Sequence, residues 1–301
     1  MSRARQGTYS IVARDPGTRE LGVAVQSHWF SVGSVVSWAR PGVGAVATQA
    51  NAEIAYGPKL LDLLEAGRSP QDALAALLAE DASAASRQVA VVDAAGRVAA
   101  HTGPDCIPFA GHVTGEAVSC QANIMASATV WPAMLEAYDA AEGNLTARLM
   151  AALEAAEGQG GDLRGKQSAA ILVVPAEGER WSTVVSLRVE DHDAPLPELA
   201  RLITLHDAYA LAARADGLVG EGRHAEAGEL YERASALAPE NHELLFWAGL
   251  GAAEAGDLDA GVRRVQAAIA MHPPWRELLE RLPEHVAPSA APVADALSGR
   301  D

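Results

Sequence analysis

The order of strand-like and helical segments over the first 195 residues is the strongest constraint on the fold. Short apolar runs come in neighbouring groups, and pairs of segments with helical spacing separate those groups. A parallel sheet would instead alternate single strands with single helices, because each parallel pair needs a long crossover connection. The pattern therefore predicts an α+β architecture with antiparallel sheets. The sequence also lacks the GxGxxG and GxxxxGK[ST] motifs that would favour a Rossmann or P-loop fold.

Turn residues and apolar spacing predict the individual elements. Four strands are expected in the first 50 residues, over 8–13, 21–27, 31–39 and 43–50. Two helices are expected between Pro58 and Glu80, the second with Ser69 as N-cap and Pro70 at its first position. The rest of this part of the chain predicts a hairpin over 88–103, an extended run over 115–125, helices over 127–156, a glycine-rich turn at 158–165 and two strands over 168–175 and 181–191.

From about Leu196 the chain is helical in pattern and repeats itself after 34 residues. Three pairs of residues carry the repeat: Gly222 and Gly256, Ala234 and Ala268, and Pro239 and Pro273. They resemble the tetratricopeptide (TPR) pattern, in which glycine sits in the turn within a repeat and proline stops the second helix. We expect two repeats, a capping helix over 275–286 and a disordered Ala/Pro/Ser-rich tail over 287–301.

Charge and cysteine content narrow the classes of function. Lys and Arg total 23 against 39 Asp and Glu, a formal charge of −16, and such a surface repels nucleic acid and anionic membranes. No run approaches the 18 apolar residues of a transmembrane helix, and the first 15 residues do not resemble a signal peptide. Cys106 and Cys120 have no metal-ligand or disulfide spacing. We therefore expect a cytoplasmic protein that binds neither nucleic acid nor membrane, with no metal and no cofactor.

Four motifs stand in order along the chain, and together they carry a resemblance to a known family. They are TYSIVARD (8–15), LGVAVQS (21–27), GVGAVATQA (42–50) and GDLRGKQS (161–168). They are similar to motifs of DUF1028, a bacterial and archaeal family of unknown function, and the resemblance runs from Thr8 to about Tyr209. That family is grouped with the Ntn-hydrolase fold. The resemblance therefore implies an αββα four-layer sandwich over 8–194, followed by the TPR-like helical domain over 195–286.

The same resemblance implies a role for Thr8. In the Ntn-hydrolase fold the side chain of the first mature residue is the nucleophile, and its free α-amine is the general base. An α-amine has a pKa of about 7.7–8.0, close to working pH. Because seven residues precede Thr8, this chemistry needs cleavage between Gly7 and Thr8. The other route is a different start of the chain, since members of the family often begin with Met directly before this threonine. The alternative is that Thr8 simply opens a strand as a β-branched residue.

Other polar residues are candidates for the same site. Ends of strands place Gln26, Ser27 and His28 near the nucleophile, and an oxyanion hole is expected from the amide of Asn123. Glycines around 160–165 gather polar side chains, where Arg164 either grips a substrate carboxylate or forms an ion pair with Asp162 that braces the loop. The complete set is Thr8, Ser27, Asn123 and Ser168 as catalytic candidates, and Gln26, His28, Gln49, Asn51, Asp162, Arg164 and Gln167 as substrate-binding candidates.

Two functions from different classes follow. The first is a hydrolase that cleaves an amide or related C–N bond of a small molecule, with Thr8 as nucleophile and base. The second is a catalytically silent binding or scaffold protein whose TPR-like helices hold a protein partner. A homodimer is also expected, because the 58–80 segment has more leucine than one sheet face needs: Leu60, Leu63, Leu64, Leu74 and Leu77.

Overall fold

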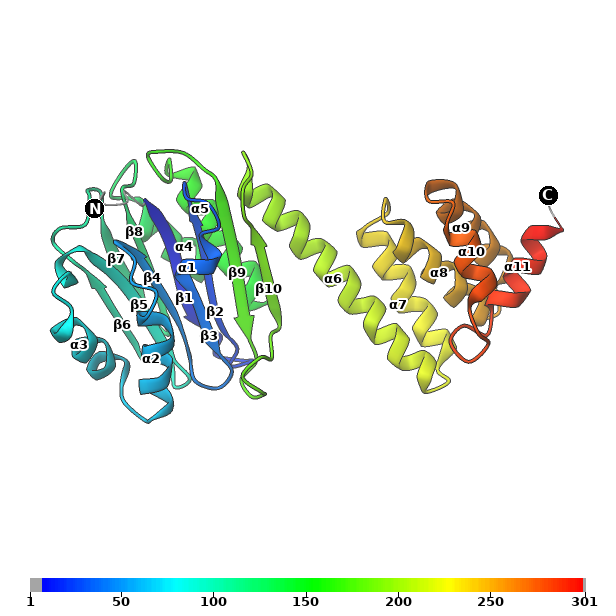
Figure 1. The fold of residues 1–301 in the computed structure, drawn as a ribbon, viewed down its shortest axis with the longest axis horizontal. Helices are drawn as coiled ribbons and strands as arrows, with labels where there is room; N and C mark the ends of the chain where they lie inside the picture. Colours follow the sequence, from blue (N-terminus) through cyan, green and yellow to red (C-terminus); the bar gives the residue numbers. More distant parts are fainter. Residues whose placement is uncertain (1–6, 300–301) are drawn as a thin grey trace. The chain divides into compact units, whose positions relative to one another are not determined.

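The computed structural model describes residues 7–299, and its chain divides after Ala200 into two compact units. The first unit is mixed α/β with two antiparallel sheets, and the second is helical (Figure 1). Within residues 7–299, no helix combines the length and the hydropathy needed to cross a membrane.

The larger sheet of the first unit has six strands in the order β10-β9-β2-β1-β8-β7. These strands are β1 (Thr8–Arg14), β2 (Leu21–Ser27), β7 (Gly111–Gly115), β8 (Val118–Asn123), β9 (Ser168–Val174) and β10 (Val185–Val189). β1 and β2 form the predicted N-terminal hairpin, and β1 also pairs with β8. This register sets Thr8 opposite Ser27 on one side and Asn123 on the other.

The second sheet has four strands in the order β3-β4-β5-β6. They are β3 (Ser37–Arg40), β4 (Gly44–Ala50), β5 (Arg87–Asp93) and β6 (Val98–Thr102). Small and β-branched side chains of the two sheets pack against each other, among them Val12, Val23, Ala47 and Val92. Because side chains alternate along a strand, every second residue of β1, β2, β4 and β5 points into this interior between the sheets.

Helices cover the outer face of each sheet (Figure 1). α4 (Val130–Ala140) and α5 (Leu145–Gly158) pack on the six-stranded sheet, and α2 (Tyr56–Glu65) and α3 (Pro70–Glu80) pack on the four-stranded sheet. The N-cap prediction is confirmed, since Ser69 accepts a hydrogen bond from the Asp72 amide at the start of α3.

The leucines expected to supply a dimer interface instead pack within the chain. Leu60, Leu64 and Leu74 are buried against the four-stranded sheet of the same chain, and Leu63 and Leu77 are partly buried there. The leucine content of α2 and α3 therefore gives no reason to expect a homodimer.

Two local predictions in the first unit are wrong. Residues 31–39 were predicted as one strand, but Gly33–Val36 forms the short helix α1 and only Ser37–Arg40 is extended, as β3. Edge strand β7 was not predicted, because GHVTG offers a single large apolar residue and so no alternating pattern.

The second unit consists of α6 (Pro195–Gly220), which begins just before the division, and five further helices. These are α7 (His224–Leu237), α8 (His242–Glu254), α9 (Leu258–Met271), α10 (Trp275–Arg281) and α11 (Ala290–Ser298). α7 and α9 begin 34 residues apart, in step with the sequence repeat. Gly222 and Gly256 precede them with positive φ values of 75° and 100°, a backbone conformation that favours glycine.

The C-terminal predictions need correction. The expected capping helix over 275–286 ends at Arg281, shortly before Pro283. The segment expected to be disordered contains helix α11, whose Val293 and Leu297 are buried beside Val262 and Leu279. Pro292 lies in the first turn of α11, where its missing N–H removes no intrahelical hydrogen bond. The last two residues of the expected tail lie outside the described part of the chain.

Candidate functional site

The candidate site lies where β1 begins and β2 and β8 end. Thr8 is 1% exposed, and its Oγ1 donates a hydrogen bond of 3.1 Å to Ser27 Oγ. The Ser27 hydroxyl in turn donates to the carbonyl oxygen of Gly7. Both side chains point into the interior between the sheets, so two hydroxyls stand in line beside the Gly7–Thr8 peptide bond.

An ion pair approaches the same carbonyl from the loop before β9. Arg164 Nη2 lies 2.6 Å from the Gly7 oxygen and 2.7 Å from Asp162 Oδ2. The side chain of Asp162 is fully buried, and it also accepts hydrogen bonds from the backbone amides of Arg164 and His28. The Asp162–Arg164 ion pair, one of the two roles considered for Arg164 from the sequence, is thus formed. It orients the guanidinium toward the Gly7 carbonyl oxygen.

Only glycine fits at position 7 in this arrangement. A Cβ built on Gly7 would lie 2.6 Å from Asp162 Oδ1, closer than real Cβ contacts come. The Gly7 carbonyl oxygen accepts hydrogen bonds from two donors, the Ser27 hydroxyl and the Arg164 guanidinium. Donors placed in this way can stabilise negative charge developing on an oxygen.

Beneath Thr8, five side chains form a buried network of amides and hydroxyls, here called the amide network: Ser10, Gln49, Gln88, Gln121 and Asn123. Gln88 Oε1 accepts from Gln49 Nε2 at 2.8 Å and from Asn123 Nδ2 at 2.9 Å. Ser10 lies between Gln49 Oε1 at 2.6 Å and Gln121 Nε2 at 2.7 Å. Gln49 and Asn123 also point amide nitrogens at the Thr8 carbonyl, at 3.3 and 3.4 Å. The network fixes the start of β1 from below.

The sequence analysis identified Gln49 and Asn123 as candidates, but it did not identify Ser10, Gln88 or Gln121. A usable signal existed, because Ser10 and Gln88 are polar residues at interior positions of otherwise apolar strands. Their bonding to β4 and β8 depends on the packing of two sheets, which strand patterns do not specify.

Gln26 is not part of the Thr8 cluster. It is adjacent to Ser27, so it points to the opposite face of the sheet, where both of its amide atoms are buried and have no hydrogen-bond partner among residues 7–299. On that face Tyr9 donates to Glu157 at 2.8 Å, and Glu157 pairs with Lys166. Burial and the nearby Glu157 carboxylate raise the pKa of Tyr9 well above its usual value.

Four other candidates lie near the site but are engaged elsewhere. Ser168 donates to the Trp29 carbonyl and accepts from the Val32 amide, which braces the loop after β2. Gln167 donates to Asp191 at 3.1 Å, and Asn51 donates to Ser86 at 3.0 Å. The exposed His28 ring lies 3.3 Å from the Lys166 carbonyl. Within residues 7–299, none of these side chains is hydrogen-bonded to the Thr8 side chain.

Exposed apolar side chains gather on the loops at this end of the two sheets. The strand registers bring together the loops after β2 and β4 and the loops before β7 and β9. These loops carry five exposed large apolar residues, here called the apolar rim: Phe30, Ile54, Ile107, Phe109 and Leu163. Backbone hydrogen bonds from Ile124 to Ile107 and from Leu163 to Ile124 tie parts of the rim to the end of β8.

Both cysteines of the chain are buried free thiols. Cys120 is fully buried on the helix-facing side of β8, where burial raises the pKa of its thiol, and Cys106 is also buried and unpaired. Among residues 7–299, no three His, Cys, Asp or Glu side chains are grouped as metal ligands would be.

Comparison with known proteins gives a family and a related structure. A search of curated proteins finds no match. The chain is similar to protein SPO2555 from Silicibacter pomeroyi, a DUF1028 crystal structure, at 34% identity and a TM-score of 0.60, over 65% of this chain and 88% of that one. The family of unknown function DUF1028 matches residues 8–199, which include every residue of the candidate site except Gly7. The chain belongs to the DUF1028 family.

Proposed function

We propose that the first unit is an Ntn-type hydrolase in which Thr8, freed by cleavage after Gly7, attacks an amide or related C–N bond. The facing sheets with helices outside them are compatible with the αββα sandwich of that fold. One observation carries the proposal: the carbonyl oxygen preceding Thr8 is held by both Ser27 and Arg164.

The first step of the proposed reaction is removal of residues 1–7. The Thr8 hydroxyl oxygen bonds to the Gly7 carbonyl carbon, its proton passes to Ser27, and Ser27 passes its own proton to the Gly7 oxygen. Arg164 stabilises the negative charge on this oxygen until the proton arrives. The carbon–nitrogen bond then breaks as the carbonyl re-forms: the proton on the Gly7 oxygen returns through Ser27 to the nitrogen, which leaves as the Thr8 amine, and an ester remains on Thr8 Oγ1. Water hydrolyses this ester, which releases the Gly7 carboxylate and leaves a free threonine.

The free threonine then acts on substrate. Its α-amine takes the hydroxyl proton as the oxygen attacks the substrate carbonyl, and it returns that proton to the leaving nitrogen. Ser27 and Arg164, no longer bonded to Gly7, become available to the substrate oxygen. Hydrolysis of the acyl ester completes the turnover. The apolar rim favours substrates with an apolar group beside the scissile amide.

Intact mass spectrometry of the purified full chain tests the first step. We expect a species lacking residues 1–7 to accumulate in the wild type and to be absent from Thr8→Ala. Removing one donor, in Ser27→Ala or Arg164→Ala, should slow cleavage about a hundredfold, as removal of an oxyanion donor does elsewhere. The matched control is Ser186→Ala, which changes an exposed serine of β10 and should leave the rate unchanged.

The second step is tested with p-nitroanilides of acetic, hexanoic and phenylacetic acids, monitored by release of p-nitroaniline. We expect turnover only from the species that begins at Thr8, with the apolar acyl groups preferred. If the wild-type chain keeps residues 1–7, the Thr8 nitrogen remains an amide and cannot act as the general base, which would contradict the proposed mechanism. Cleavage in Thr8→Ala would show that Thr8 is not the attacking group.

We also propose that the second unit is TPR-like. The support is the 34-residue offset between α7 and α9, with a left-handed glycine before each. A binding role for this unit is the alternative function of the chain. A groove in this unit indicates which kind of partner it would bind.

A further inference from the structure

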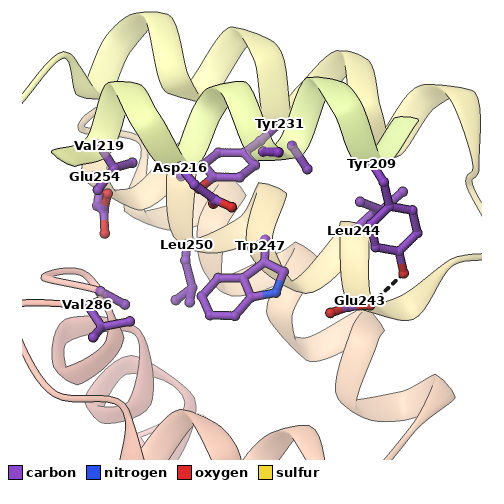
Figure 2. A pocket seen from close by; sticks show the side chains of 14 residues that line it. Tyr209, Asp216, Val219, Tyr231, Glu243, Leu244, Trp247, Leu250, Glu254 and Val286 are labelled. Carbon is purple, nitrogen blue, oxygen red and sulfur yellow. Dashed lines mark hydrogen bonds between the residues drawn. The ribbon is translucent and has the colours of Figure 1, made fainter. Parts of the chain in front are cut away.

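A groove of about 380 Å³ opens on the second unit, between α6, α8 and the segment after α10 (Figure 2). Trp247 of α8 stands in the middle of the groove, with Leu250 beside it and Val286 opposite. Tyr209 and Val286 are 39% and 46% exposed. The groove is therefore open to solvent at these two positions.

Small residues let aromatic side chains pack closely along the groove. A Cβ built on Gly251 would lie 2.5 Å from the Tyr231 ring, so glycine at this position lets Tyr231 lie against α8. Ala212 and Ala213 of α6 line the groove with small side chains. Three aromatic side chains, Tyr209, Tyr231 and Trp247, also line it, and the face of an aromatic ring attracts cations.

The charged lining is entirely acidic: Asp216, Glu243 and Glu254, with no lysine or arginine. Asp216 and Glu243 lie on either side of Trp247 (Figure 2). Each accepts a tyrosine hydroxyl at 2.5 Å through one oxygen, Asp216 from Tyr231 and Glu243 from Tyr209. Their other oxygens have no hydrogen-bond partner within residues 7–299. Asp216 and Glu243, on either side of the Trp247 ring, thus each keep one carboxylate oxygen that accepts no hydrogen bond from residues 7–299.

We propose that this groove binds an extended peptide segment in which an arginine neighbours an apolar side chain. The planar guanidinium would stack on Trp247 and donate to the free oxygens of Asp216 and Glu243. The apolar neighbour would lie against Leu250 and Val286. Arginine fits better than lysine, because its fork of donors can serve two acceptors while its face stacks on a ring. This proposal is independent of the hydrolase chemistry of the first unit.

Fluorescence anisotropy with two labelled peptides tests the recognition. The first is a short peptide of alternating leucine and arginine, and the second has glutamine in place of arginine. We expect the arginine peptide to bind the full chain at least tenfold more tightly, with an affinity that falls as salt is added. The double variant Asp216→Asn/Glu243→Gln should lose about tenfold in affinity.

Matched variants separate the groove from the acidic surface in general. Ala213→Trp places a ring in the groove from an exposed position and should abolish binding, whereas Ala210→Trp, on the same helix outside the groove, should not. Glu240→Gln removes one exposed charge away from the groove and serves as the charge control.

Three outcomes would overturn the proposal. The first is equal affinity for the two peptides, and the second is an equal loss in Glu240→Gln and in the double variant. The third is self-association of the chain that Ala213→Trp abolishes, which would show that a second copy occupies the groove.

Discussion

Asp162 shows how one side chain can support a site without taking part in its chemistry. Its carboxylate is fully buried, and its partners are Arg164 and two backbone amides. Loss of one member of a buried ion pair is costly because the other charge stays buried. We predict that Asp162→Asn lowers the free energy of unfolding in urea by about 3 kcal/mol and slows cleavage after Gly7.

The control for that prediction is Asp62→Asn. Asp62 also pairs with an arginine, Arg40, but its side chain is 63% exposed. Its loss should cost less than about 1 kcal/mol. Equal destabilisation by the two substitutions would show that the Asp162 pair contributes no more than a surface pair.

At the same scale, the sequence predicted the partners of Thr8 only in part. Thr8 and Ser27 were predicted together because one begins a strand and the other ends one, and Asn123 was added as an oxyanion-hole amide. The register does place the three side by side. Gln26 was grouped with them by sequence proximity, although alternation along β2 turns it to the other face. Gln88 was missed because its contacts come from a second sheet, and sheet-on-sheet packing is not encoded in local spacing.

At the scale of elements, Asp81 joins the end of α3 to the start of β5. It accepts from Arg87 Nε at 2.7 Å, Ser83 N at 2.8 Å and Tyr56 Oη at 3.1 Å. The hydrogen bond from Arg87 is the main reason that the pKa of Asp81 lies below its usual value of 3.8. A carboxyl with a lowered folded-state pKa stabilises the fold at neutral pH, and this contribution is lost as pH falls below the unfolded value and through the folded one.

We therefore predict that Asp81→Asn destabilises the protein at about pH 7 and has less effect at about pH 3. Urea unfolding at the two pH values measures this difference. A constant difference between variant and wild type across that range would mean that the ionised form of Asp81 adds no stability.

Several elements were predictable because a local signal determined them, and others were not. The β1–β2 hairpin follows from two short apolar runs on either side of a Pro-Gly turn, and α3 follows from its helical spacing and its Ser69 cap. In contrast, the β-branched residues of 31–39 suggested a strand, but Gly33–Val36 turns into a helical segment whose Val36 packs between the sheets. α11 was missed because its Ala/Pro/Ser composition hides an apolar face, which becomes buried only when α8, α9 and α10 pack against it.

At the scale of the whole molecule, each unit has its own hydrophobic core. Val12, Val23 and Ala47 belong to a core of the first unit, and Phe246 and Val262 to a core of the second. We predict that a fragment ending at His206 folds without the remaining helices. Scanning calorimetry should give a cooperative transition for this fragment within a few degrees of one seen in the full chain, and a fragment without a cooperative transition would contradict the prediction.

The amide network beneath Thr8 has a consequence for enzymology. It is built from hydroxyls and carboxamides, which carry no charge at any working pH. Its bonds lead through Thr102 to His112, whose pKa burial lowers from the usual 6.5, so that imidazole is neutral wherever an α-amine titrates. The floor of the proposed active site is therefore electrostatically silent, and a pH–rate profile above neutrality would report one ionisation, that of the Thr8 amine.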